Sequence, residues 1–465
     1  MTTPPRLPRH DLERIWTAAL AAIEPRRLVA ALPPGLVAPA EDGRVVVVGG
    51  GKAAAGMAAG VADLLGAALV APERIRGVVS VPEGCGWEVA GGQGHRSSDP
   101  LPVAIEIRAT RPAAVNQPTP AVVAATGEML HMLATLGSDD RAIAVITGGG
   151  SALLELPAEG VELADVIAVT DALSRAGAGI EDLNTVRRAV SRVKAGGLAR
   201  ACRAGRMVAL VLSDVIGDPL DFIASGPCMP TGADPAAARA VLDRFAIAPS
   251  VAPRLAAHLA RARTPAVIDG TGPEWTTSAG CHVSHQLVGH NATAVAAARV
   301  AAEDLGYRIV SPEEPPAPDG SAESVGFRLA RRGSELARLV AHDGQPRGWI
   351  EGGEATVTVP ATHGRGGRNQ QTVLAALVAA AAGAAWPPGL ALASIGTDGE
   401  DGPTDAAGAV ADAAVWALAA SAPAAAREAL DRCDAHPFLD RIGGLVRSGP
   451  TGTNVADLRI VLARR

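Results

Sequence analysis

Residues 44–54, RVVVVGGGKAA, decide the fold, because a run of valines passes directly into three glycines and a lysine. An unbroken β-branched run is typical of a strand that is buried on both faces, as in a parallel sheet. The alanine-rich residues 53–69 that follow predict a helix. We therefore expect a strand, a tight glycine turn and a helix, the repeating unit of α/β folds with a parallel sheet.

The same transition from an apolar strand to a polar, glycine-containing loop recurs three more times. Strands are predicted at residues 143–146, 207–212 and 390–395, and they run into TGGGS, SDVIGD and GTDGEDG. Ligands of open α/β sheets bind outside the carboxyl ends of the strands. The sequence thus predicts an α/β fold with a Rossmann-like parallel sheet, helices on both of its faces, and a ligand site made by these loops.

Chain length and the positions of turn-forming residues predict the domain organisation. A chain of 465 residues is long enough for two or three domains. The turn at residues 230–234 indicates a boundary, so that residues 1–232 and 233–465 form two α/β domains. Within the second domain, apolar and polar side chains alternate over residues 355–359, which predicts a strand. The long uncharged run of residues 369–397 includes the sequence WPPG at 386–389. Since this sequence would break a membrane-spanning helix, we expect a buried helix, a turn and a strand there.

Composition argues against several classes of protein. The formal net charge is -6 and only 2% of the residues are aromatic. The chain therefore offers neither a basic surface for nucleic acid or a membrane nor a platform for stacked bases. The cysteines are scattered, which suits buried thiols in a reducing compartment, and the N-terminal residues lack a secretory cleavage site. We expect a cytoplasmic protein whose partners are small molecules, with a homodimer left open.

Lysine is scarce, since only Lys52 and Lys194 are lysines among the 42 basic residues. Under a bias toward arginine, a retained lysine indicates a place where a compact charge on a flexible stem is needed. Both lysines lie beside glycine-rich segments. Gly49, Gly50 and Gly51 with Lys52 predict a phosphate cradle, because glycines let backbone N–H groups approach an anion.

Two further segments are candidates for binding an anion. Gly149, Gly150 and Ser151 form a second glycine turn, which could also be a plain turn. Residues 184–197 predict one basic helix, on which Arg187, Ser191 and Lys194 would share a face. Three donors on one stripe suit an anionic substrate, although a solvated basic face would have the same pattern.

Carboxylates follow two of the predicted strands. Asp214 and Asp218 flank one loop, and Asp398, Asp401 and Asp405 flank another. Hard carboxylates between glycines suit Mg²⁺, and Asp218, Asp398 and Asp401 are the metal-ligand candidates. Asp214 is a candidate to receive a hydroxyl proton. The alternative for each is an Asx turn or a helix cap.

A last group of candidates lies in the C-terminal half. Arg368 follows glycines at the start of a predicted helix, where its guanidinium could clamp a carboxylate or neutralise a transferring phosphoryl group. Glu354, Asn369 and Asn454 occupy neighbouring polar turns and are candidates for binding substrate or nucleotide.

Taken as an ordered set, these segments resemble the glycerate 2-kinase family, which includes proteins labelled hydroxypyruvate reductase in tartrate-degradation operons. The matching motifs are GGGKAAAGM, ITGGGSALL, LNTVRRAVSRVKAGGLA, LSDVIGDPLDFIASGP, GGEATVTV, GRGGRNQ, GTDGEDGPTDAAGA and TGTNVADL. From about residue 345 the chain is similar to the domain called MOFRL. The resemblance implies phosphorylation of D-glycerate at its 2-hydroxyl by ATP with Mg²⁺, in a cleft between two α/β domains. It also places the family's proposed catalytic lysine and arginine at Lys52 and Arg368.

One loop departs from the family pattern. Where the family has a Gly-His-Pro-x-Pro-Asp type of loop, this chain has TRPAAVNQP at residues 110–118, so the preferred substrate could be a related small hydroxy acid. Two other functions remain open. The turn at Gly49 fits a relaxed dinucleotide fingerprint with Ala54, which would suit an NAD(P)H-dependent hydroxypyruvate reductase. A sensor that binds a sugar acid without turnover is the third alternative.

Overall fold

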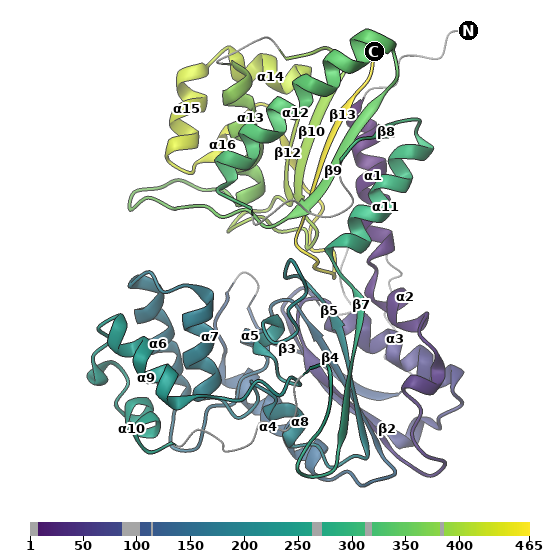
Figure 1. Ribbon diagram of the computed structural model, residues 1–465, viewed down its shortest axis with the longest axis vertical. Coiled ribbons are helices and arrows are strands. Elements are labelled where there is room, and N and C mark those ends of the chain that lie inside the picture. Colours follow the sequence, from purple (N-terminus) through teal and green to yellow (C-terminus); the bar gives the residue numbers. More distant parts are fainter. Residues whose placement is uncertain (1–7, 86–102, 113–114, 263–271, 312–318, 382–385) are drawn as a thin grey trace. The chain divides into compact units, whose positions relative to one another are not determined.

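The computed structural model describes residues 8–85, 103–112, 115–262, 272–311, 319–381 and 386–465 (Figure 1). These residues divide into two compact units, which we describe separately. The parallel-sheet unit contains the described residues between Pro25 and Gly289. The antiparallel-sheet unit contains residues 8–24 and 290–465. The boundary therefore differs from the predicted one near residue 232, because residues 233–289 complete the first unit.

The parallel-sheet unit is built on a seven-stranded sheet with the order β3-β2-β1-β4-β5-β7-β6. Every neighbouring pair is parallel except β6 with β7. The Rossmann-like parallel sheet expected from the valine run is thus confirmed. The strands are β1 (Val45–Gly50), β2 (Ile75–Pro82), β3 (Ala104–Arg111), β4 (Arg141–Thr147), β5 (Arg206–Leu212), β6 (Glu274–Thr276) and β7 (His282–Gly289).

The order of the strands reverses between β1 and β4. From β1 the chain moves outward through β2 to β3, whereas from β4 it moves the other way through β5 to β7. Such a reversal leaves a crevice at the carboxyl ends of the two central strands, because their following connections leave in opposite directions. The turns after β1 and β4, both of them glycine turns, lie at this switch point.

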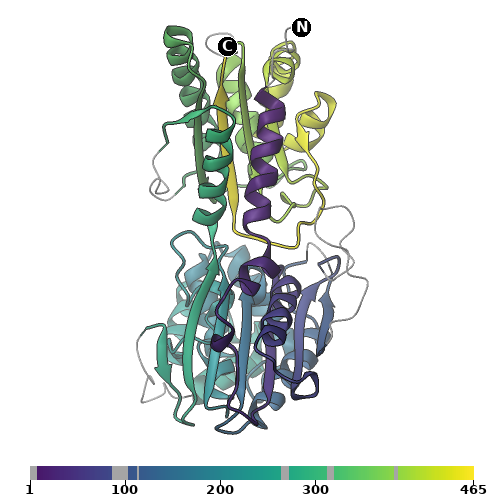
Figure 2. The same cartoon turned by 90° about the vertical axis from the view of Figure 1, so that its right-hand side faces the viewer.

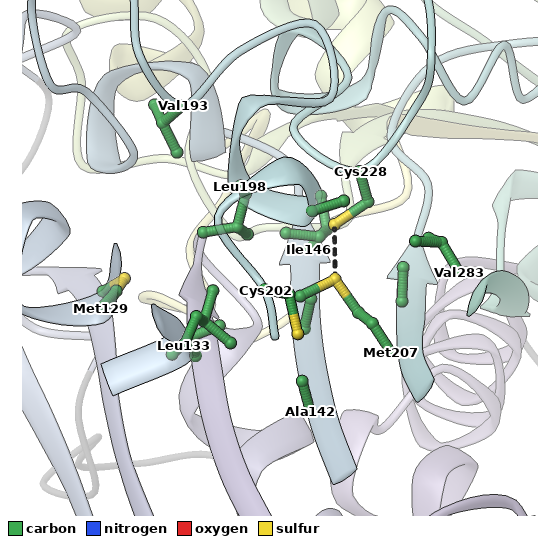
Figure 3. Packing of buried hydrophobic residues seen from close by; sticks show 14 of the residues in the cluster. Met129, Leu133, Ala142, Ile146, Val193, Leu198, Cys202, Met207, Cys228 and Val283 are labelled. Carbon is green, nitrogen blue, oxygen red and sulfur yellow. Dashed lines mark hydrogen bonds between the residues drawn. The ribbon is translucent and has the colours of Figure 1, made fainter. Parts of the chain in front are cut away.

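Helices and a continuous apolar core surround the sheet. Packed side chains from β4, β5 and β7 include Met207, whose sulfur lies 3.9 Å from that of Cys228 (Figure 3). A separate cluster of four helices, α6, α7, α9 and α10, has a small apolar core of its own. The helices of this unit are α2 (Pro25–Ala30), α3 (Ala54–Ala67), α4 (Pro120–Ala134), α5 (Gly150–Leu153), α6 (Leu163–Arg175), α7 (Ile180–Ala189), α8 (Gly197–Arg200), α9 (Pro235–Arg244) and α10 (Pro253–Arg261).

The predicted basic helix over residues 184–197 is wrong. Helix α7 ends at Ala189, Ser191 forms an isolated bridge with Pro157, and α8 starts only at Gly197. Beyond Ala189 the backbone pairs with residues 156–158, because the N–H of Ala158 donates to Val190 at 2.7 Å and that of Arg192 donates to Leu156 at 2.8 Å. Arg187, Ser191 and Lys194 therefore do not share a helix face.

The antiparallel-sheet unit has the strand order β12-β11-β10-β13-β9-β8. The strand predicted at residues 390–395 is present as β10, but it pairs antiparallel with β11 and β13. Its carboxyl end therefore does not share an edge with the other three glycine-ended strands, as the sequence pattern suggested. The strands are β8 (Arg308–Ile309), β9 (Arg347–Gly353), β10 (Leu390–Gly396), β11 (Gly408–Ala411), β12 (Leu445–Val446) and β13 (Asp457–Ala463).

Helices cover both faces of this second sheet. Figure 2 shows α1 and α11 side by side on one face, and Figure 1 shows α12 and α13 on the other. Asp11 on α1 accepts hydrogen bonds from Tyr307 and Arg464, which explains why the first helix belongs to this unit. The helices are α1 (Pro8–Ala22), α11 (Asn291–Asp304), α12 (Ala322–Asp343), α13 (Arg368–Ala381), α14 (Ala413–Ala420), α15 (Pro423–Asp431) and α16 (Ala435–Arg441).

Two expectations for the C-terminal half have opposite outcomes. The uncharged run folds as predicted, with α13 buried and followed by β10. The strand expected at residues 355–359 is wrong, because β13 begins at Asp457 opposite Gly353 and leaves no partner strand beyond that point. Of the helices in the described ranges, none is both long and apolar enough to cross a membrane.

Candidate active site

The glycine turn after β1 is held against the turn after β4. Gly49 and Gly51 have φ angles of 147° and 143°, which side chains rarely adopt. A Cβ at Gly49 would lie 2.0 Å from the carbonyl oxygen of Val145 on β4. The backbone N–H of Lys52 donates to the carbonyl of Gly148 at 2.9 Å. Two of the predicted glycine turns are therefore joined at the switch point, with Lys52 at the junction.

The second glycine turn packs directly on the first. A Cβ at Gly150 would lie 3.0 Å from the carbonyl oxygen of Gly50 and 2.8 Å from the Cβ of Ala224. There is therefore no room for a side chain at Gly150. The three-glycine sequences thus permit a close approach of two backbones, which leaves their polar groups at the carboxyl edge of the sheet.

Lys52 and Arg111 flank the same glycine. Gly149 has a φ of 77°, and a Cβ built on it would lie 3.6 Å from both the Cγ of Lys52 and the Nη2 of Arg111. Lys52 is half-buried, whereas Arg111, at the end of β3, is only 4% exposed. The sequence analysis singled out Lys52 and the loop of residues 110–118, but it assigned no role to Arg111 within that loop. The available signal was that Arg111 also ends a strand of the parallel sheet.

The hydroxyl of Ser151 is part of a buried hydrogen-bond chain. Its oxygen lies 2.5 Å from that of Ser225, which in turn donates to the side chain of Asn184 at 2.9 Å. Ser225 has a φ of 63°, so this contact is fixed by an unusual backbone conformation. Ser151 is therefore held as a hydrogen-bonding group at the second glycine turn.

Lys194 has a different place from the one predicted. Its ammonium donates to the carbonyls of Ser151 and Leu154 at 2.8 and 2.9 Å and pairs with Glu155 at 3.3 Å. The side chains of Lys194 and Glu155 are both 0% exposed, and burial lowers the pKa of Lys194 to about 8. Through these contacts Lys194 holds the segment after the second glycine turn from inside the protein.

Arg187 converges on the same carbonyl, although not through a shared helix. Its guanidinium donates to the carbonyl of Ser151 at 2.7 Å. The Ser191 hydroxyl accepts from the backbone N–H of Val193 at 3.4 Å, which is a local turn contact. Arg187 thus adjoins the second glycine turn as predicted, whereas Ser191 serves the turn in its own segment.

The antiparallel-sheet unit contains a second charged group, centred on Arg368 at the start of α13. Its guanidinium donates to both carboxylate oxygens of Asp457, at 2.8 and 3.0 Å, and to Glu354 at 3.0 Å. Asp457 is fully buried, whereas the side chain of Arg368 remains 35% exposed. Such a two-oxygen pair fixes the plane of the guanidinium. The buried carboxylate of Asp457 therefore orients the guanidinium of Arg368, part of whose surface remains accessible to solvent.

Glu354 lies in a crowded acidic environment. Burial raises its pKa, the charge of Arg368 opposes that shift, and the carboxylates of Asp457, Asp398 and Asp319 add to it. The structure therefore brings Glu354, Arg368 and Asp398 close together, as expected from their turns. Sequence reasoning missed Asp457, which appears in the sequence simply as the first residue of a strand.

Two of the predicted binding residues, Asp401 and Asn369, make hydrogen bonds inside the antiparallel-sheet unit. Asp401 accepts hydrogen bonds from the backbone N–H groups of Asn369 and Gln370, at 3.0 and 2.8 Å, and so caps α13. Burial raises its pKa to about 6. The side chain of Asn369 donates to Asp457 and accepts from Ser394, and it is 1% exposed. Asp401 thus caps α13, and Asn369 connects Asp457 with Ser394 inside the unit.

The remaining candidates lie on the loops that follow their strands. Asp214 and Asp218 are half-buried after β5, and Asp218 has a φ of 53°. Asp398 accepts from the backbone N–H of Glu400 at 3.1 Å, an Asx turn, and Asn454 accepts from that of Ala456 at 3.2 Å. Within the described ranges there is no group of three or more His, Cys, Asp or Glu side chains arranged to hold a metal ion.

Comparisons with known proteins cover nearly the whole chain. The model described as "Domain of unknown function (DUF4147)" matches residues 11–260, and the MOFRL family model matches residues 348–457. The chain is 35% identical to glycerate kinase of Bos taurus, covering 88% of this chain and 83% of that protein. It is 33% identical to D-glycerate 2-kinase of Thermotoga maritima, covering 90% of each.

The chain belongs to the glycerate 2-kinase family. A crystal structure of glycerate kinase from Thermotoga maritima has a TM-score of 0.75 at 31% identity and covers 98% of this chain and 99% of that chain. The resemblance seen in the ordered motifs is thereby confirmed. As a glycerate 2-kinase family member, the protein presents its lysine at the switch point of one unit and its arginine at the start of α13 in the other. In the loop of residues 110–118, which departs from the family pattern, Ala113 and Ala114 lie outside the described residues.

Proposed function

We propose that this protein transfers the γ-phosphoryl group of ATP to the 2-hydroxyl of D-glycerate. The observation that carries the proposal is the pair of glycine turns at the switch point, joined through the backbone N–H of Lys52 and bordered by two cationic side chains. Phosphoryl transfer requires positioning and charge neutralisation far more than covalent chemistry. The relatives' names, glycerate kinase and D-glycerate 2-kinase, support the same reaction.

Lys52 neutralises charge on the transferring phosphoryl group in this proposal. Its half-buried stem lies along Gly149, so the ammonium at its end can follow the phosphoryl group as the P–O bond lengthens. A flexible stem with a compact charge suits this role better than a planar fork. The bias against lysine elsewhere in the chain is consistent with such a requirement.

Arg368 orients the carboxylate of the hydroxy acid or the phosphoryl group in the same reaction. Three of its N–H groups are used on Asp457 and Glu354, which leaves others for a reactant. The two-oxygen contact with a buried carboxylate fixes the fork before the reactant arrives, which lowers the entropic cost of binding.

Asp214 receives the proton of the substrate hydroxyl in this proposal. The chemistry of the donor set fits Mg²⁺ with ATP, because this cation takes one or two carboxylates together with phosphate oxygens and water. Asp218 in the parallel-sheet unit and Asp398 in the antiparallel-sheet unit are each a proposed carboxylate, whereas Asp401 is engaged by two backbone N–H groups. When bound, Mg²⁺ would offset phosphate charge.

The function is tested by following ADP release with D-glycerate and by identifying the product with ³¹P NMR. We expect turnover that requires ATP and gives the 2-phosphate. A parallel assay follows NADH loss with hydroxypyruvate, and turnover there without ADP release in the first assay would favour the reductase.

The role of Lys52 is tested with Lys52→Arg, which keeps the charge but changes its shape and reach. We expect kcat to fall at least 100-fold, about 3 kcal/mol at 1.36 kcal/mol per factor of ten, with a modest change in KM. Arg44→Lys, in an exposed pair with Asp140, is the control for a conservative cation exchange. Near-normal kcat in Lys52→Arg would remove this residue from the chemistry.

A further inference from the structure

We infer that Arg111 is the second cation of the Lys52 site and binds an anionic group of the hydroxy-acid substrate, its carboxylate. The inference deepens the proposed function, on which it rests, by naming a residue that selects the substrate. It starts from the observation that two cationic side chains, Lys52 and Arg111, border the same glycine, Gly149.

Arg111 and Lys52 reach Gly149 from different strands of the sheet. Arg111 is the last residue of β3, two strands away from β1, and Lys52 follows β1. The Nη2 of Arg111 and the Cγ of Lys52 both lie 3.6 Å from the position of a Cβ on Gly149. The Nη2 of Arg111 and the Cγ of Lys52 are therefore separated by no more than about twice this distance, which places the guanidinium beside the stem that carries the ammonium.

The chemistry of Arg111 favours a carboxylate. A guanidinium presents a planar fork of N–H groups that matches the two oxygens of a carboxylate, and it stays protonated at every physiological pH. Arg111 is also 4% exposed, so bulk water competes little for its N–H groups. A phosphate of the nucleotide has the same anionic oxygens, and the experiment below separates the two sources.

The position of Gly149 gives the inference a second test. Its φ of 77° penalises any side chain, and a Cβ there would contact both Lys52 and Arg111 at 3.6 Å. Gly160 has nearly the same φ, 79°, in the same unit, but a Cβ there would meet nothing within 4 Å. Gly160→Ala therefore reproduces the backbone strain of Gly149→Ala without intruding between the two cations.

The principal experiment compares Arg111→Gln and Arg111→Lys with the control Arg108→Gln. Arg108 lies on the same strand and pairs with Glu106 and Glu128 at the surface. We expect KM for D-glycerate to rise between about 10- and 100-fold in Arg111→Gln, the loss of a charge-assisted contact, and less in Arg111→Lys. KM for ATP should change less than about twofold, and Arg108→Gln should behave as wild type.

The opposite split would overturn the assignment to the substrate: if KM for ATP rises while that for D-glycerate stays constant, the anion is a nucleotide phosphate. If neither KM changes in any Arg111 variant whose circular dichroism and Tm match wild type, Arg111 is not part of the site. In the glycine pair, Gly149→Ala should raise KM for D-glycerate at least fivefold more than Gly160→Ala, and equal effects would contradict the proposed contact.

A binding measurement keeps this inference separate from the proposed function. Calorimetry with D-glycerate and with inorganic pyrophosphate needs no turnover. If wild type binds D-glycerate and Arg111→Gln loses that affinity tenfold or more, the inference stands even if no ADP release is found. If ADP is released normally but Arg111→Gln binds D-glycerate as tightly as wild type does, the kinase assignment stands and the role of Arg111 is refuted.

Discussion

Breaking the buried pair between Lys194 and Glu155 should destabilise the parallel-sheet unit, and removing both charges should restore much of the loss. Lys194→Met deletes an ammonium that donates to two carbonyls and leaves Glu155 inside the protein. Both side chains are 0% exposed, so water cannot replace the missing partner. Breaking such a pair costs about 3–5 kcal/mol, whereas replacing both members by apolar residues of similar volume is often close to neutral.

The expected free energies follow as a double-mutant cycle. Lys194→Met should lower the free energy of unfolding by about 3–5 kcal/mol, and Glu155→Leu by a smaller amount, since Lys194 keeps its two carbonyl partners. The double variant should be more stable than Lys194→Met alone, with a coupling energy of at least about 2 kcal/mol. Urea unfolding gives the totals, and hydrogen–deuterium exchange of β4 and β5 assigns the loss to this unit.

Two results would refute this reasoning about the pair. If the single changes simply add, the two groups do not compensate each other. If Lys194→Met costs less than about 1 kcal/mol, the ammonium is not needed inside the protein. The anion-binding role that the sequence analysis gave to Lys194 would then be favoured.

Three further predictions concern single positions. Burial lowers the pKa of Lys194 from 10.5 to about 8, so the unfolded chain binds more protons than the folded protein between these pH values. The free energy of unfolding of wild type should therefore rise by up to about 3 kcal/mol relative to that of Lys194→Met as pH increases from 8 to 10.5. Urea unfolding at each pH measures this difference. Gly49→Ala should cost about 3 kcal/mol or more, since its Cβ would meet a backbone oxygen at 2.0 Å, whereas Gly127→Ala within α4, with nothing near its Cβ, should raise Tm slightly. Asp401→Asn should cost about 1–2 kcal/mol at pH 7, because an amide cannot accept from both N–H groups at the start of α13, and an unchanged Tm would contradict the capping role.

Several features of the site were accessible from the sequence because they are local. The valine run and the glycines after it identified β1, its turn and Lys52, and the same pattern identified β4 and Gly149. These signals succeed because a strand buried on both faces must be apolar throughout, and because only glycine accepts the φ angles and the 2.0 Å approach found at Gly49.

Other assignments failed where a local pattern has two physical explanations. The basic segment containing Arg187 and Lys194 looked like one helix face, but the helix ends at Ala189 and the chain then pairs with residues 156–158. An aspartate among glycines suits a cation or a helix cap equally well, and Asp401 is a cap because α13 happens to begin beside it.

By itself, the sequence determined strands β1, β4, β5 and β10, the glycine turns that follow β1 and β4, and the family to which the chain belongs. Only the tertiary structure decided that β10 pairs antiparallel, that residues 233–289 complete the first sheet, that Lys194 is buried on Glu155, and that Arg111 shares Gly149 with Lys52. The physical reason is that strand order and side-chain contacts between distant segments depend on which surfaces pack together. No window of neighbouring residues contains that information.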